Sequence, residues 1–397
     1  MVLPGYQFGG MEHPGCIQFR DQTIFLGEQP TPDEEMNRLN LIAHETSHLW
    51  FGDLVTMRWF DDVWTKEVFA NFMADKIARE QFPDVNHDIK FIKSHYPLAL
   101  STDRTEGTHP IQQPLDNLKN AGLLYGNIIY HKAPIMMRKL EEQMGEEKFR
   151  TGLQKYLRTY SYGNATWDAL IAILDQECPE AGISAFDQQW VKHKGMPEIT
   201  IDINDGNFDP FAYGHYQLTD TDHHWLLDNW FKLPETPRFA AMMYLYESFL
   251  RRHIDNKTAF ESLVNGIRRQ DNVLVQSTCI NYLLTILSYA TNDERTYFEN
   301  TLWTLGQQAN DPAQRKVLLQ GITQRATTLG IVSQIYELWK DCSDKAFNER
   351  DYMRIAYHLA IMMPDQWEEI INTERQRLTH ADMQREFDFI SRGCHPE

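Results

Sequence analysis

The chain has 397 residues, more than one compact hydrophobic core usually holds, so two or more domains are expected. Its 42% apolar and 24% charged residues are ordinary for a globular protein and exclude a wholly disordered chain. The 38 basic and 56 acidic residues give a net charge of −18, which argues against nucleic acid as a partner. No stretch approaches the roughly 18 consecutive apolar residues of a bilayer-spanning helix, so no membrane span is expected.

The cysteines indicate neither a disulfide framework nor a thiolate zinc site. They are few, far apart and in no Cys-x-x-Cys pair: Cys16, Cys178, Cys279, Cys342 and Cys394. The first residues also lack the basic and long apolar regions of a signal peptide.

The N-terminal region predicts short strands and then two helices. Cys16–Phe19 and Gln22–Leu26 have strand-like composition between turns that contain Gly and Pro. Thr31 is followed by Pro32 and Glu34, which is typical of a capped helix start, and we expect this helix to run from Pro32 to about Phe51. A second helix is expected over roughly Trp64–Gln81.

The middle of the chain predicts further helices and one strand pair. We expect two helices over 127–160 with a break at Gly145, then a helix from a Thr166 cap to about Gln176. Ser184 is expected to cap one more helix, and Gly195 to take a left-handed conformation after it. Alternating polar and apolar residues predict a strand over Glu198–Ile203, with Tyr213–Leu218 as its candidate partner.

Beyond Pro237 the sequence predicts only helices, with apolar residues three and four positions apart. The expected segments are Arg238–Arg252, Lys257–Arg269, Val273–Tyr289, Asp293–Gln308, Pro312–Arg325, Ile331–Lys340, Arg350–Met363 and Asp365–Leu378. They resemble the paired helices of a superhelical array, although no repeat of fixed period is present. We expect this part to act as a packing scaffold.

The first long helix contains the pattern His44-Glu45-Thr46-Ser47-His48. Residues four apart on a helix differ by about 40° around its axis, so both imidazoles project from one face. Imidazole nitrogens suit Zn²⁺, and Glu45 is placed to take a proton from a water molecule at the metal.

Glu67 is the candidate third ligand. Eighteen residues separate it from His48, enough for the chain to leave the first helix, turn and return on the second. Two His and one Glu leave a coordination position open for water, which is the catalytic form of a zinc site. We expect one Zn²⁺ per chain, bound by His44, His48 and Glu67. Asn71, one helical turn after Glu67, is a candidate hydrogen-bond donor behind the metal.

Together with Gly9-Gly10-Met11-Glu12-His13 and Tyr130-x-Lys132, this pattern resembles the M1 family of zinc aminopeptidases, which are gluzincins. The resemblance implies a mostly helical, thermolysin-like α+β domain followed by an all-α superhelical, HEAT-like domain. The expected division is a catalytic domain at 1–197, a short β connector at 198–234 and a helical domain at 235–397. Asp220–His224, although rich in metal-binding residue types, is expected to be a solvated loop.

The resemblance also implies roles for the remaining candidates. Glu45 would be the general base, and Tyr130 would hydrogen-bond the oxyanion. Glu12 would pair with the free α-ammonium of a peptide substrate. The residues that would line the substrate are Gly9, Gly10, Met11 and His13. His13 stands where the family pattern usually has Asn.

The implied activity is removal of the N-terminal residue from peptides that have a free N-terminus. Alternatives are an endopeptidase or epoxide hydrolase on the same zinc site, and a non-catalytic interaction fragment with a retained zinc site. Members of the family usually carry a β-rich domain before the Gly-x-Met-Glu segment, so we expect an N-terminally truncated piece of a longer protein. A cytoplasmic location is slightly favoured over export, and oligomeric state and residue preference are not readable from the sequence.

Overall fold

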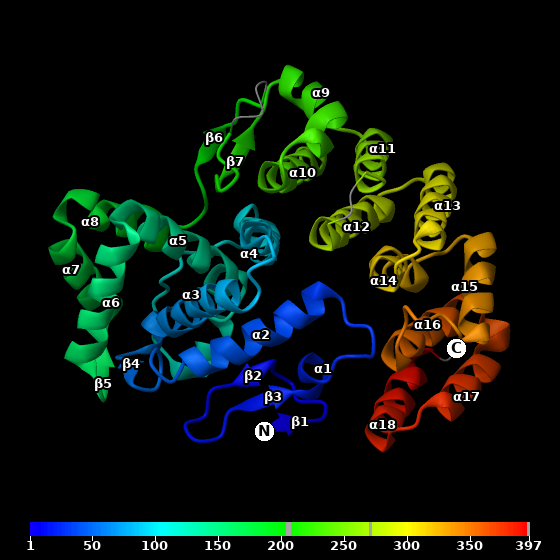
Figure 1. Cartoon of the computed structure of the whole chain (residues 1–397), viewed down its shortest axis with the longest axis horizontal. Helices are drawn as coiled ribbons and strands as arrows, with labels where there is room; N and C mark the ends of the chain where they lie inside the picture. Colours follow the sequence, from blue (N-terminus) through cyan, green and yellow to red (C-terminus); the bar gives the residue numbers. More distant parts are fainter. Residues whose placement is uncertain (204–207, 270–271, 395–397) are drawn as a thin grey trace. The chain divides into compact units, whose positions relative to one another are not determined.

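The computed structural model describes residues 1–203, 208–269 and 272–394, which form two compact units (Figure 1). The first unit consists of Met1–Ile24, Glu35–Asp222 and Pro234–Met243. The second consists of Phe25–Glu34, His223–Leu233 and Tyr244–Glu397. The segment at 198–222, expected to belong to a separate connector, packs with the first unit. The three-part division of the chain into domains remains a prediction.

The described strands of the first unit form small sheets. In the sheet of order β1-β3-β2, β3 (Gln18–Arg20) pairs in parallel with β1 (Val2–Leu3) and antiparallel with β2 (Gly10–Met11). Two further parallel pairs join β4 (Val55–Met57) to β5 (Gly163–Ala165), and β6 (Glu198–Thr200) to β7 (His215–Gln217). The predicted pairing of the last two segments is confirmed, over shorter spans than expected.

One strand prediction in this region was wrong. Asp21–Ile24 forms the short helix α1, where a strand over Gln22–Leu26 was expected. The Asp21 carboxylate accepts a hydrogen bond from the backbone N–H of Gly5 at 3.4 Å, which ties this helix to the N-terminal strand region. A run of five residues with three apolar side chains is too short to distinguish a strand from a helical turn.

The other regular elements described in the first unit are helical. They are α2 (Pro32–Ser47), α3 (Val63–Gln81), α4 (His87–Asp103), α5 (Ala133–Met144), α6 (Glu146–Tyr160), α7 (Trp167–Glu177), α8 (Ile183–Phe186) and parts of α9 (Asp220–Asn229) and α10 (Glu235–Leu250). Short 3₁₀ turns occur at Phe60–Asp62, Leu118–Leu123 and Pro179–Ala181, and π-helical turns at Ile128–Lys132 and Asp187–Val191.

Most of the predicted helices are confirmed, with differences at their ends. Gly145, at φ 82°, separates α5 from α6 as expected, and Thr166 caps α7 by accepting a hydrogen bond from the Ala169 N–H at 3.2 Å. The helix expected to reach Phe51 ends at Ser47. The backbone N–H groups of Leu49 and Trp50 donate to carbonyls three residues earlier, as in a 3₁₀ turn, and not four residues earlier. Ser184 lies inside α8 and does not cap it, since that helix begins after Gly182.

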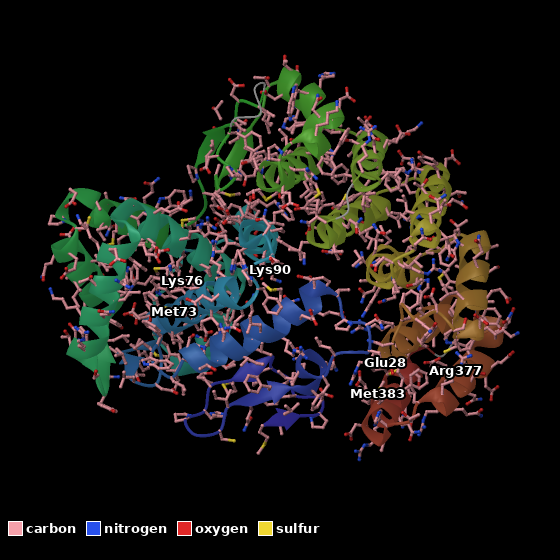
Figure 2. All side chains as sticks on the ribbon, in the orientation of Figure 1. Glu28, Met73, Lys76, Lys90, Arg377 and Met383 are labelled. Carbon is pink, nitrogen blue, oxygen red and sulfur yellow. The ribbon has the colours of Figure 1, made fainter. Side chains whose placement is uncertain are left out.

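Helix α4 was not predicted, and it packs in the core of the first unit. Asn86 caps it by accepting a hydrogen bond from the Ile89 N–H at 3.1 Å. Lys90 of α4, labelled in Figure 2, donates a hydrogen bond to Asn37 of α2 at 2.6 Å. This contact joins α4 to the helix that carries the paired histidines.

A fully buried ion pair anchors the π-helical turn Ile128–Lys132. Lys132, which is 0% exposed, places its ammonium 2.8 Å from Asp103 Oδ2 at the end of α4 and donates to the Gly195 carbonyl at 2.7 Å. The Tyr213 hydroxyl also donates to Asp103, at 3.0 Å. These partners satisfy charges that would otherwise be costly to bury.

The second unit consists of successive helices. They are α11 (Asn256–Ile267), α12 (Val273–Ser288), α13 (Asn292–Gln308), α14 (Pro312–Gln320), α15 (Leu329–Asp341), α16 (Glu349–Met362), α17 (Trp367–Arg377), α18 (Ala381–Ile390) and the remainder of α9 and α10. Neighbours in sequence pack together, as α11 with α12, α13 with α14 and α16 with α17 (Figure 1). The predicted helices from 257 onward are confirmed, and α18 was missed.

The segment Asp220–His224 begins helix α9 and is not the solvated loop that was expected. His223 is buried, its ring stacks on His253 with centroids 5.3 Å apart, and its Nε2 lies 3.1 Å from the Ser248 hydroxyl. Its surroundings are those of a packed histidine. None of the helices in the described part of the chain combines the length and apolar character that crossing a bilayer requires.

The substitution Lys132→Met should lower the free energy of unfolding by about 3–5 kcal/mol, because it leaves the Asp103 carboxylate buried without its cation. Urea denaturation followed by circular dichroism measures this change. Lys119→Met is the matched control on an exposed lysine and should change stability by less than about 0.5 kcal/mol. Equal stability of the two variants would contradict the anchoring role of the pair.

Candidate active site

Helix α2 places His44, Glu45 and His48 at its C-terminal end. The expected capping box is present at its start: Thr31 Oγ1 accepts from the Glu34 N–H at 3.2 Å, and Glu34 Oε2 accepts from the Thr31 N–H at 2.8 Å. Although His48 lies just beyond the assigned helix, its N–H still donates to the His44 carbonyl at 3.2 Å. The two imidazoles therefore share one face, as the four-residue spacing predicts.

Glu67, in the first turns of α3, completes the cluster. The distance from His44 Nε2 to His48 Nε2 is 3.1 Å, and Glu67 Oε2 lies 3.4 and 3.5 Å from these two nitrogens. Ligands about 2.0–2.1 Å from a tetrahedral zinc ion are separated from one another by about 3.3–3.4 Å. The three atoms thus fit a single Zn²⁺ ion without rearrangement.

Hydrogen bonds at the far side of both rings determine which nitrogen faces the cluster. His48 Nδ1 lies 3.1 Å from the Phe51 carbonyl, which can only accept, so this nitrogen carries the proton. His44 Nδ1 lies 2.9 Å from Asn71 Oδ1. Both Nε2 atoms therefore direct lone pairs at Glu67 Oε2, an arrangement of three acceptors that a cation would stabilise.

Asn71 connects this cluster to Tyr130. Its Nδ2 donates to the Tyr130 carbonyl at 3.1 Å, which orients the amide so that Oδ1 accepts from His44. The sequence predicted Asn71 behind the metal as a donor, whereas toward His44 it is an acceptor. The π-helical turn that carries Tyr130 is thereby attached to a metal-ligand candidate.

Glu45 lies beside the cluster and against strand β2. It is 4% exposed, and this burial raises the pKa of its carboxyl to about 7 despite the attraction of His44. A Cβ atom on Gly10 would lie only 2.6 Å from Glu45 Cγ. Glycine at position 10 is therefore what lets the carboxylate lie against the strand.

Glu12 follows β2 directly and faces the same cluster. One ligand atom from each of Glu12, Glu45 and His48 lies within 4.8 Å of the others. Glu12 pairs with Lys66, the residue before Glu67, and Lys66 Nζ also lies 3.3 Å from Glu67 Oε1. Burial opposes ionisation of Glu12, but the hydrogen bond to Lys66 and the attraction of Lys66 and His48 together outweigh this and lower the pKa of the carboxyl. Sequence reasoning missed Lys66, which has no motif signal of its own.

The other expected substrate-binding residues lie along the same segment. The Gly9 carbonyl accepts from the Arg20 N–H at 2.8 Å, and Gly10 and Met11 pair with Phe19 and Gln18 of β3. His13 is exposed after this strand, and its carbonyl accepts from the Cys16 N–H at 2.9 Å. The segment thus forms an extended edge next to Glu45.

Tyr130 is partly buried in the π-helical turn, and its ring stacks loosely on Tyr125 with centroids 6.2 Å apart. Burial, with added repulsion from the negative charge of Glu67, raises the pKa of its phenol. The hydroxyl is therefore protonated at neutral pH and able to donate a hydrogen bond.

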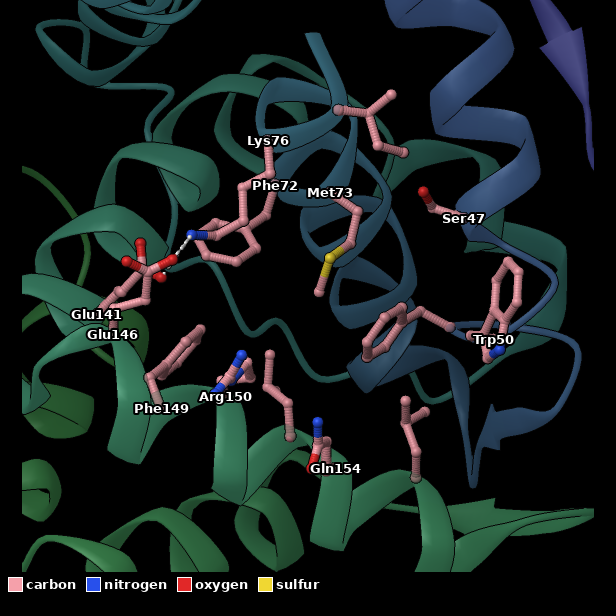
Figure 3. A pocket seen from close by; sticks show the side chains of 14 residues that line it. Ser47, Trp50, Phe72, Met73, Lys76, Glu141, Glu146, Phe149, Arg150 and Gln154 are labelled. Atoms are coloured by element: carbon pink, nitrogen blue, oxygen red, sulfur yellow. Dashed lines mark hydrogen bonds and ion pairs between the residues drawn. The ribbon is translucent and has the colours of Figure 1, made fainter. Parts of the chain in front are cut away.

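Two hollows adjoin this region. A polar hollow of about 250 Å³ lies beyond Asn71 and Tyr130, with Asp75 and His95 on its wall. An apolar cavity of about 380 Å³, shown in Figure 3, is bounded by Phe72 and Phe149, with Lys76 paired to glutamates at its edge. The apolar cavity contains none of the candidate catalytic residues.

The family profile of the peptidase family M1 domain matches residues 1–190, which include the whole cluster. This part of the chain belongs to peptidase family M1. The M1 domain therefore holds every candidate from Gly9 to Tyr130.

Named relatives agree with this assignment. Probable aminopeptidase 2 of Sulfurisphaera tokodaii is 34% identical over 208 residues, covering 51% of this chain and 26% of the relative. Leucyl aminopeptidase of Saccharolobus solfataricus is 30% identical over 208 residues, with 51% and 26% covered. Aminopeptidase N of Lactococcus lactis subsp. cremoris is 30% identical over 346 residues, covering 76% of this chain and 40% of the relative. The matched region is thus a quarter to two fifths of these relatives.

Two substitutions at Asn71 should separate its two hydrogen bonds. Asn71→Ala removes the acceptor for His44 and should weaken zinc binding about 10–100-fold. Asn71→Asp keeps an acceptor for His44 while losing the donor to Tyr130, so its zinc affinity should remain within a few-fold of that of the original protein. Competition with a chromophoric chelator measures both. Unchanged affinity in Asn71→Ala would show that this bond does not orient His44.

Gly10→Ala should displace Glu45 and leave the zinc ligands in place, because the added methyl group occupies the space of the Glu45 side chain. We expect kcat to fall by about 10²-fold or more, as for loss of a general base, with unchanged zinc stoichiometry. Gly9→Ala is the matched control, since a Cβ there has its nearest atom, Leu41 Cδ1, at an ordinary 3.5 Å. Equal activity of the two variants would refute this role of Gly10.

Proposed function

We propose that this chain contains the catalytic centre of a zinc-dependent aminopeptidase, which removes the N-terminal residue from peptides. The observation that carries the proposal is the position of Glu12. Its carboxylate lies within 4.8 Å of both the general-base candidate Glu45 and the ligand candidate His48. A carboxylate at this distance from the metal residues can hold a free α-ammonium one residue away from the bond to be cut.

His44, His48 and Glu67 would hold the zinc ion, because their facing atoms lie at the mutual separations of ligands on one such ion. When bound, zinc supplies a Lewis acid that polarises a carbonyl and makes water more acidic. The names of the relatives, which include leucyl aminopeptidase and aminopeptidase N, support the same reaction class.

The side chains of this chain would move the proton and stabilise the charge. Glu45 takes a proton from the attacking water as the new C–O bond forms, and returns it to the amine nitrogen as the C–N bond breaks. Tyr130 donates a hydrogen bond to the carbonyl oxygen as negative charge develops there. Glu12 pairs with the substrate ammonium throughout and so sets which bond reaches the metal.

The pairwise packing of the helices in the second unit supports a further part of this proposal, that they form a HEAT-like superhelical array. We also propose that the first unit is thermolysin-like, because α2 and α3 are arranged around the candidate zinc ligands. A scaffold role for the array follows from its regular packing.

The zinc-loaded protein should hydrolyse leucine p-nitroanilide, lose this activity with a chelator and regain it with Zn²⁺. Glu45→Gln should lower kcat by about 10²–10⁴-fold at unchanged zinc content. N-acetyl-leucine p-nitroanilide is the matched substrate control, and it should not be cleaved if Glu12 requires a free amine. Absence of turnover in a folded, zinc-loaded chain would contradict the proposal, and cleavage of the acetylated substrate would favour an endopeptidase.

A further inference from the structure

Lys66 occupies the point where the amine-binding carboxylate meets the metal ligands. Its ammonium pairs with Glu12 Oε1 and lies 3.3 Å from Glu67 Oε1. The side chains of Lys66 and Glu12 are only 15% and 17% exposed, and the side chain of Glu67 is only 5% exposed. This is therefore a largely desolvated contact, which solvent and salt screen less than an ion pair at the surface.

The two oxygens of Glu67 have different partners. Oε2 faces the imidazoles of His44 and His48, whereas Oε1 faces Lys66. Lys66 therefore binds the oxygen that does not face the metal cluster, together with the Glu12 carboxylate. It stands between the residue that would hold the substrate and a residue that would hold the metal.

An ε-ammonium and an α-ammonium are the same chemical group, a compact cation with three N–H donors. Under the proposed function, on which this inference rests, the substrate places its α-ammonium on Glu12 beside the metal ligands. Lys66 already places an ammonium there. The two cations must share the Glu12 carboxylate, and like charges at such a distance repel each other.

We propose that Lys66 is a specificity-determining residue that competes with the substrate α-ammonium for Glu12. Lys66 then sets how tightly the site binds a free N-terminus, without taking part in bond cleavage. A carboxylate can accept more than one donor, so the substrate binds beside Lys66 or displaces it from Oε1. In either case removal of the lysine charge leaves Glu12 with the substrate as its partner.

The test compares Lys66→Met with the original zinc-loaded protein on leucine p-nitroanilide. KM should fall roughly three- to tenfold and kcat should change less than about twofold, because the lost charge opposes binding and not chemistry. Lys66→Arg keeps the cation, so its KM should stay closer to that of the original protein. Lys119→Met, on an exposed lysine, controls for the loss of one positive charge from the chain and should leave KM unchanged.

A double-mutant cycle tests whether Lys66 acts on KM through Glu12. In a Glu12→Gln background, where the contested carboxylate is absent, Lys66→Met should no longer lower KM. If KM in Lys66→Met rises or stays unchanged in the presence of Glu12, the proposal is wrong and Lys66 orients Glu12 instead. An equal decrease in both backgrounds also overturns it, since the effect would then not pass through Glu12.

A binding measurement separates failure of this inference from failure of the aminopeptidase proposal. L-Leucinol carries a free amine but no scissile bond, and calorimetry measures its affinity for the zinc-loaded protein without turnover. Tighter binding by Lys66→Met than by the original protein supports the competition even if neither cleaves the anilide. Equal or weaker binding overturns it. Zinc content and thermal unfolding confirm the folded state, and Lys66→Gln replaces Lys66→Met if the latter does not fold.

Discussion

The close approach of His44 Nε2, His48 Nε2 and Glu67 Oε2, at 3.1–3.5 Å, is the constraint on which the rest of the site depends. Three acceptor atoms at this separation repel one another unless a cation lies between them. The surrounding structure maintains the arrangement through bonds at the outer side of each candidate ligand. The Phe51 carbonyl and Asn71 orient the rings, and Lys66 binds the second oxygen of Glu67.

Two of the candidate catalytic side chains, Glu12 and Tyr130, come from segments of the first unit outside α2 and α3. Strand β2 places Glu12 beside Glu45, and it approaches closely because Gly10 has no side chain. A π-helical turn, which is often found at functional sites, carries Tyr130. The buried pair of Lys132 and Asp103 holds that turn, and Asn71 attaches it to His44. Rigid contacts of this kind are what hold a reactive group in position.

Local patterns predicted those elements whose stability is mainly local. The capped start of α2, the break at Gly145 and the cap of α7 each depend on residues within one helical turn, and each is confirmed. The helices α4 and α9 were missed although each begins with a local cap, from Asn86 and from Thr219. Lys66, by contrast, has no local signal. Its role depends on partners that no spacing rule connects to it.

The sequence by itself predicted the chemistry of the site, since the residue types and the four-residue spacing of His44 and His48 place two candidate metal ligands on one helical face. It also determined the family of residues 1–190. Only the tertiary structure decided which oxygen of Glu67 faces His44 and His48, that Asn71 accepts from His44, and that Lys66 pairs with Glu12, 54 positions away. Hydrogen bonds and ion pairs act over a few ångströms, so side chains that are distant in sequence interact only when the packed core brings their segments together.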